Sequence, residues 1–131
     1  MDPVDLLVRF AAFGVPVGLA TGLGLGLVAR KADGWGGYAG LRRRAARLGH
    51  IAAVMIPALG GVYGLLLEAR PHAASLAEVG AWLWVVGGIA LPLALFWAAW
   101  KPRHLPALVP PALVVFTASA LLGAALWGGF P

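Results

Sequence analysis

The segment of residues 41–67 constrains this chain most, because it joins an arginine cluster to a long run without charges. Arginine is stable at a membrane surface but very costly inside the hydrocarbon layer. The uncharged run extends to Glu68 and is as long as the roughly 20 residues that a membrane-spanning helix needs. The segment therefore predicts a membrane helix whose entry point is fixed at its charged end. The cluster comprises Arg42, Arg43, Arg44 and Arg47.

The composition of the whole chain agrees with a membrane protein. Hydrophobic residues make up 61% of the 131 residues and charged residues only 11%, whereas water-soluble domains are about 25% charged. The net charge of +5 comes from basic residues in loops between apolar runs, which is the positive-inside pattern. We therefore expect the lipid bilayer as a partner and no binding to nucleic acid. The absence of cysteine excludes disulfides, iron–sulfur clusters and thiol catalysis.

Four apolar runs predict an all-α integral membrane domain that occupies the whole chain, residues 1–131. Because the connections between the runs are short, an up-down-up-down four-helix bundle is the expected topology. The loops at residues 30–47 and 101–103 are basic, whereas the N-terminus is acidic and the loop at residues 68–78 is nearly neutral. Basic loops stay in the cytoplasm, so both termini are predicted to be non-cytoplasmic, in a bacterial-type inner (plasma) membrane. The predicted spans are residues 10–29, 48–67, 79–100 and 105–127.

Glycine recurs at every fourth position of the first run, at Gly14, Gly18, Gly22 and Gly26. Such a stripe lets another helix backbone approach closely, as in the GxxxG helix pairs of membrane proteins. We expect the stripe to contact other membrane subunits, although a small bundle can also use it between its own helices. The adjacent GLGLGL sequence is no phosphate-binding loop, because it follows no strand and lies inside a membrane span.

The first loop collects six cationic residues against one aspartate, Asp33. We interpret it as a cytoplasmic anchor; the alternatives are binding of anionic lipid headgroups and pairing with carboxylates of a partner or cofactor. Tryptophans near both ends of the third run indicate the two membrane interfaces, since the rise from the first to the last is about 27 Å. These residues are Trp82, Trp84, Trp97 and Trp100.

His50 lies on the arc of the second helix that faces other helices. At about 100° per residue, small residues such as Ala53 and Gly61 surround it, and Pro57 on the same arc predicts a bend. Large aliphatic residues occupy the opposite arc and are expected to face lipid. They include Ile51, Met55, Ile56, Leu59, Val62, Tyr63, Leu66 and Leu67.

Two classes of function remain once catalysis is considered. The predicted spans contain no aspartate, glutamate, lysine or arginine, and no triad, HExxH motif or carboxylate pair occurs within plausible reach. We therefore expect no independent catalytic activity. The first hypothesis is an accessory subunit of a larger inner-membrane complex, such as a respiratory or photosynthetic electron-transfer complex. The second is an electron-transfer membrane protein that binds a b-type haem or another tetrapyrrole.

The haem hypothesis names His50 and His104 as axial ligands of the iron, because both precede helices that run away from the basic side. Arg44, Arg47 and Arg103 are the residues expected to pair with the propionates. The arrangement is loosely similar to that of small b-type cytochromes, whose helix bundles hold haem between histidines. The alternatives are an interfacial role for His104, and a single His50 that coordinates the magnesium of a chlorophyll-type pigment.

Overall fold

The computed structural model describes residues 1–29, 40–70 and 73–128, and this part of the chain is all-helical. Each of four helical segments is long and apolar enough to cross a membrane, the fourth comprising a 3₁₀ helix and the α-helix after it. The chain is thus a multi-pass membrane protein by the length and composition of its helices. The elements are α1 (Pro3–Ala29), α2 (Leu41–Ala69), α3 (Ala74–Trp100), the 3₁₀ helix η1 (Pro102–Leu108) and α4 (Val109–Trp127).

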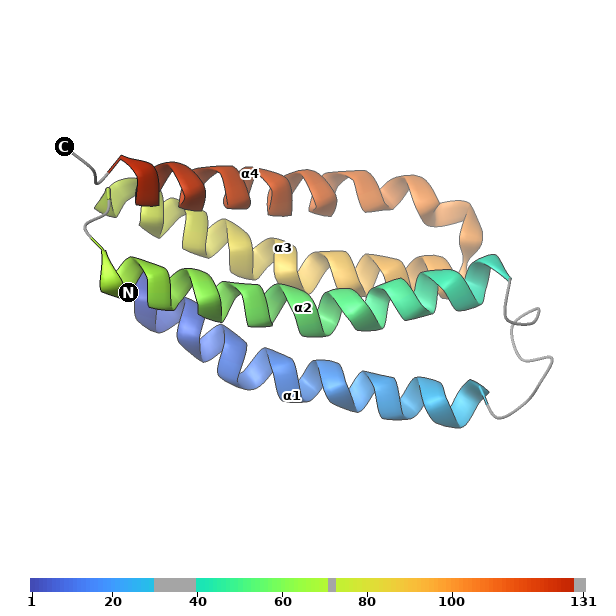
Figure 1. Cartoon of the computed structure of the whole chain (residues 1–131). Coiled ribbons are helices and arrows are strands. Elements are labelled where there is room, and N and C mark those ends of the chain that lie inside the picture. Colours follow the sequence, from blue (N-terminus) through green and yellow to red (C-terminus); the bar gives the residue numbers. More distant parts are fainter. Residues whose placement is uncertain (30–39, 71–72, 129–131) are drawn as a thin grey trace.

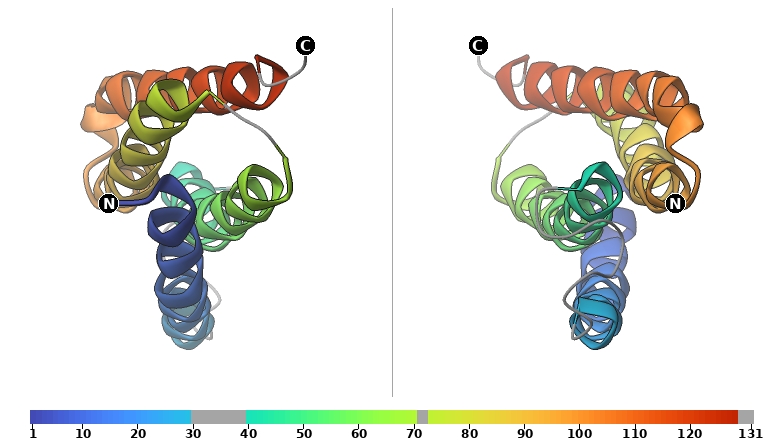
Figure 2. Two further views of the ribbon diagram at one scale, coloured as in Figure 1. Left: turned by 90° about the vertical axis from the view of Figure 1, so that its left-hand side faces the viewer. Right: turned by 90° about the vertical axis from the view of Figure 1, so that its right-hand side faces the viewer.

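The four helices form an open series around a central pair. Figure 1 shows consecutive helices running in opposite directions, so that the start of α1 and the end of α4 lie at the same end. Helix α2 packs against both α1 and α3, while α4 packs on α3 and barely meets α2. In the end-on views of Figure 2, α1 and α4 point away from the α2–α3 pair in different directions. The outer helices therefore keep long faces that no other helix of the described chain covers.

Three of the helices begin before their predicted spans, including α3, which begins at Ala74 and not at Val79. Helix α2 begins at Leu41, because its arginines and alanines are good helix formers and continue the helix outside the hydrocarbon layer. Helix α1 begins at Pro3, where the side chain of Asp2 accepts a hydrogen bond of 3.2 Å from the amide of Val4. The glycine-rich turn predicted at residues 30–39 lies outside the described residues.

The fourth α-helix begins at Val109, four residues after the predicted start at Leu105. Proline lacks the amide proton that an α-helix needs beyond its first turn. The segment before Val109 contains Pro102 and Pro106 and adopts a 3₁₀ helix instead. Pro110 and Pro111 then occupy the first turn of α4, where the missing protons leave no helical bond unmade.

The glycine stripe of α1 packs against α2 of the same chain. A Cβ built on Gly14 would lie 2.6 Å from the ring of Pro57, and one built on Gly18 would overlap the carbonyl group of Ala53. The prediction of a close helix contact is therefore confirmed for Gly14, Gly18 and Gly22, whereas Gly26 has no neighbour within 4 Å. Contact of this stripe with other subunits stays a prediction, and α2 already covers three of its four glycines.

Trp84 anchors α2 to α3 in the centre of the structure. Its side chain is only 3% exposed, and its Nε1–H donates a 2.9 Å hydrogen bond to the carbonyl oxygen of Ile56. The ring of Tyr63 meets it edge-on at 5.1 Å between centroids. The prediction that Trp84 marks an interface is wrong, and so is the assignment of Ile56 and Leu67 to the lipid face, since both are buried. The reason is that α2 has two helical neighbours, so a second face of it is covered.

We predict that Gly18→Leu destabilises the isolated protein by about 1–3 kcal/mol, because the new side chain overlaps the backbone of α2. Thermal unfolding in detergent measures the effect. Gly26→Leu on the same helix is the matched control and should unfold like the parent, because nothing lies within 4 Å of that position. Equal unfolding of the parent and Gly18→Leu would contradict the packing of α1 on α2.

Candidate functional site

The imidazole of His50 is held at the interface between α1 and α2. Its Nδ1 atom lies 3.0 Å from the carbonyl oxygen of Gly18 and 3.1 Å from Oγ1 of Thr21. The hydroxyl of Thr21 in turn donates a 2.6 Å hydrogen bond to the same carbonyl oxygen. The orientation of His50 toward another helix, expected from the sequence, is therefore present, and a backbone carbonyl and one hydroxyl fix the ring.

These partners determine the tautomer of the neutral imidazole. The carbonyl oxygen of Gly18 can only accept a hydrogen bond, so Nδ1 of His50 carries the proton. Nε2 then has the free lone pair, and no hydrogen bond to it is found within residues 1–29, 40–70 and 73–128. Histidines that ligate metals have the same arrangement, with one ring nitrogen donating to a carbonyl and the other available for the ligand.

Glycine and proline make the close approach of the two helices possible. A Cβ on Gly22 would lie 2.5 Å from Cε1 of His50, so the ring packs directly on the backbone of α1. Two turns further along α2, Pro57 has no amide proton to donate to the carbonyl oxygen of Ala53. The backbone of Gly18 lies against that carbonyl group. The geometry of the site therefore requires glycine at two positions of α1, Gly18 and Gly22, because a side chain at either position would overlap α2.

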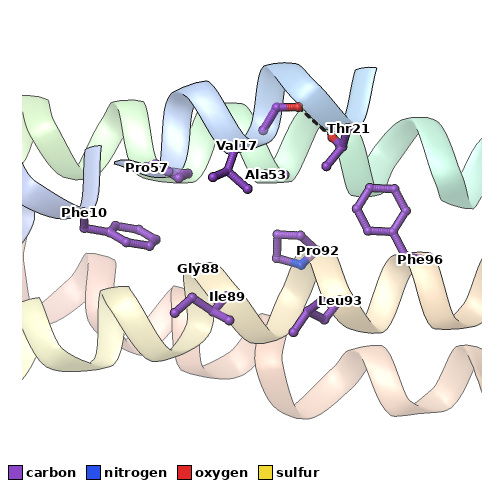
Figure 3. A pocket seen from close by; sticks show the side chains of 12 residues that line it. Phe10, Val17, Thr21, Ala53, Pro57, Gly88, Ile89, Pro92, Leu93 and Phe96 are labelled. Carbon is purple, nitrogen blue, oxygen red and sulfur yellow. Dashed lines mark hydrogen bonds between the residues drawn. The ribbon is translucent and has the colours of Figure 1, made fainter. Parts of the chain in front are cut away.

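An apolar cavity of about 180 Å³ adjoins the site between α1, α2 and α3 (Figure 3). Phe10 and Phe96 lie toward its two ends, and Pro57 and Pro92 face each other across it. Thr21 belongs to its lining, whereas His50 does not. The cavity is smaller than the roughly 300–1,000 Å³ of typical small-molecule pockets.

His104 lies in a different environment from His50. It belongs to η1, where its Nε2 accepts a 3.2 Å hydrogen bond from Nε–H of the neighbouring Arg103. Its ring is tilted against Trp97 of α3, with 6.1 Å between centroids. No contact between His50 and His104 occurs in the described part of the chain. Their pairing on one iron stays a prediction, and each ring has partners on a different helix.

The three arginines predicted to bind propionates lie at the same end of the structure as the two histidines. Arg44 is exposed and Arg47 half-buried in the first two turns of α2, while Arg103 is exposed in η1. Within the described ranges, no group of three or more histidine, cysteine, aspartate or glutamate side chains is arranged to hold a metal ion. The chemistry available at His50 is therefore that of a single imidazole ligand or of a hydrogen-bond acceptor in apolar surroundings.

The sequence signalled part of this site. His50 was identified from its arc on the helical wheel, whereas the partnership with Thr21 was missed. Thr21 is the one hydroxyl residue between residues 10 and 29, which marks it as a candidate polar contact. Comparisons with protein-family models, with curated proteins and with solved structures found no match to this chain.

We predict that nitrogen NMR of histidine-labelled protein near neutral pH shows a protonated Nδ1 and an unprotonated Nε2 for His50, because Gly18 offers only an acceptor. The resonances of His50 are assigned as those that disappear from the spectrum of the His50→Gln variant. Thr21→Val should keep this tautomer, since the carbonyl remains. A spectrum in which Nε2 carries the proton would contradict the described geometry.

Proposed function

We propose that this protein is a small accessory subunit of a larger inner-membrane complex, with respiratory and photosynthetic electron-transfer complexes as the leading candidates. One observation carries the proposal: within the described part of the chain, no neighbouring group lies within 4 Å of a Cβ built on Gly24, Gly26 or Gly123. Glycine inside a helix is less favourable than alanine by about 1 kcal/mol. The glycines at the α1–α2 contact allow close packing within the chain, whereas no packing in the described part of the chain requires glycine at these three positions. Close packing against a helix of another subunit would require glycine there.

The positions of these glycines support the same proposal. Gly24 and Gly26 are in α1 and Gly123 is in α4, the two outer helices of the series. Both outer helices are largely exposed within the chain. Small residues that allow close approach therefore occur on the faces that are open to lipid or to a partner helix. Ala120 and Ala124 are exposed next to Gly123 and extend the small surface of α4.

We predict that Gly26→Leu and Gly123→Leu each reduce co-purification of partner subunits, because a leucine at either position blocks close helix contact. The measurement is quantitative mass spectrometry of the tagged protein, expressed at its natural level and extracted in mild detergent. Val86→Leu, a lipid-exposed substitution on α3, is the control and should purify like the parent. Migration of the parent as a lone 13.5 kDa species would contradict the proposal.

The charges support an orientation with the arginine-rich end in the cytoplasm. Six of the described basic residues belong to the start of α2 and to the segment 101–103. These segments are at one end of the helices, and the starts of α1 and α3 and the end of α2 are at the other (Figure 1). The described carboxylates are all at this second end, and translocation of clustered arginine is disfavoured. They are Asp2, Asp5, Glu68 and Glu78.

We predict that a reporter fused after Pro131 behaves as periplasmic or external, because α4 starts from the basic end. Alkaline phosphatase and a green fluorescent protein give complementary signals from the two sides. A second pair of fusions in the loop after Arg30 is the internal control and should show the opposite behaviour. Fluorescence of the C-terminal fusion would contradict this orientation.

A second candidate function is tetrapyrrole binding, which the free lone pair of His50 Nε2 favours. The group would be haem b or a chlorophyll-type pigment, and it would supply electron transfer or light absorption. His104 is the proposed second ligand of a haem, with Arg44, Arg47 and Arg103 for its propionates. The proposal ranks second because the cavity beside the site measures only about 180 Å³. A single chain in this conformation therefore does not enclose a porphyrin ring.

If haem binds, the protein purified from haem-replete membranes shows a Soret band and a reduced-minus-oxidised difference spectrum. We expect His50→Ala to abolish this spectrum. His104→Ala converts it from low spin to high spin if both histidines are ligands and leaves it unchanged if His50 acts alone. A pure parent protein without absorption in the visible range would exclude the tetrapyrrole.

A further inference from the structure

Cationic side chains from two distant parts of the sequence meet in one hollow at the arginine-rich end. Arg42 comes from the first turn of α2, whereas Lys101 lies between α3 and η1 and Arg103 lies in the first turn of η1. Trp100 and Pro102 complete the lining, and the hollow measures about 360 Å³. Because α2 and α3 are antiparallel neighbours, their packing brings these segments together (Figure 1).

The electrostatics of the hollow call for an anion. The carboxylates of residues 1–29, 40–70 and 73–128 belong to the starts of α1 and α3 and to the end of α2, which lie at the opposite end of the helices from the start of α2 (Figure 1). Lys101 contributes its Nζ atom at 5.2 Å from the ring centroid of Trp97, and Arg103 donates to the neutral acceptor of His104. Neither contact supplies a negative charge. Three convergent cations repel one another, and a bound anion removes this repulsion.

The depth of the hollow indicates what kind of anion binds there. Trp100 ends the third membrane helix and is 71% exposed, the position that tryptophan takes among lipid headgroups. Two further exposed apolar side chains, Leu41 and Trp97, are next to the cationic residues along the chain. The lining of the hollow therefore combines cationic groups that bind phosphate with the apolar side chains of Trp100 and Pro102. A phospholipid likewise has a charged phosphate close to its apolar acyl chains.

We propose that this hollow binds the headgroup of an anionic phospholipid. The guanidinium forks of Arg42 and Arg103 each present paired N–H donors suited to two phosphate oxygens, and Lys101 adds a point charge. Basic pockets between membrane helices bind lipid headgroups in this way. The site is distinct from the glycine faces, so it stands independently of the proposed subunit role, and it shares Arg103 with the second candidate function.

The test compares phosphatidylglycerol with phosphatidylcholine of identical acyl chains, using native mass spectrometry of the detergent-purified protein. We expect the parent to bind phosphatidylglycerol more tightly. Arg42→Gln/Arg103→Gln should weaken this binding about 25-fold, at about fivefold for each charge removed. Arg9→Gln/Arg70→Gln removes two arginines from the other end and is the matched control, expected to bind like the parent. Arg42→Lys/Arg103→Lys keeps both charges and should retain part of the preference, which also controls for folding.

Three results would overturn the proposal. The first is equal binding of the two lipids by the parent. The second is an equal loss of phosphatidylglycerol binding in Arg42→Gln/Arg103→Gln and in the control Arg9→Gln/Arg70→Gln. The third is displacement of phosphatidylglycerol by inorganic phosphate at matched ionic strength, which would identify a soluble phosphate as the ligand. The headgroup site is supported if phosphatidylglycerol stays bound in the presence of inorganic phosphate and if only Arg42→Gln/Arg103→Gln loses phosphatidylglycerol binding.

Discussion

The close contact between α1 and α2 is the interaction on which the candidate site depends. In a bilayer, helices do not associate through the hydrophobic effect, so their stability comes from van der Waals packing and from hydrogen bonds between them. Gly18 and Gly22 provide the van der Waals packing, because their backbone atoms contact Ala53 and His50 directly. The same approach brings the carbonyl oxygen of Gly18 within 3.0 Å of Nδ1 of His50. Packing and hydrogen bonding therefore reinforce each other at one place.

The central position of α2 explains why the helices form an open series. One face of α2 meets the glycines of α1, and another meets Trp84 of α3 through the carbonyl oxygen of Ile56. Helix α4 then packs mainly on α3, with Leu122 against Gly80. With two helices at the edges, the protein keeps exposed glycines that its own packing does not use. This is the physical basis for expecting a partner in the membrane.

Charge is separated along the helices because consecutive helices reverse direction. Segments that follow odd-numbered helices come to one end, so the start of α2 and the residues after α3 share a surface. Arg42 and Arg103 are far apart in sequence and line the same hollow for this reason. The carboxylates of the described residues are at the opposite end, including Asp5 in its 2.7 Å ion pair with Arg9. The proposed membrane orientation and the proposed lipid site thus depend on the same distribution of charge.

The sequence alone determined the features that follow from local composition. These are four apolar segments of membrane length, a helix contact at the glycines of α1, and a histidine directed toward another helix. Each depends on the order of residues along one helix, since helical periodicity places them on a common face. Local pattern also misled where a helix has more than one neighbour. Trp84 and Ile56 resembled lipid-facing or interfacial residues and are buried.

Only the tertiary structure decided which helices meet and how each is rotated about its axis. It selected Gly18 and Thr21 as the partners of His50, and it left His104 against Trp97. It covered Gly22 and left Gly26 open on the same stripe. The physical reason is that periodicity gives the direction of a side chain relative to its own helix, whereas a contact also requires the position of a second helix.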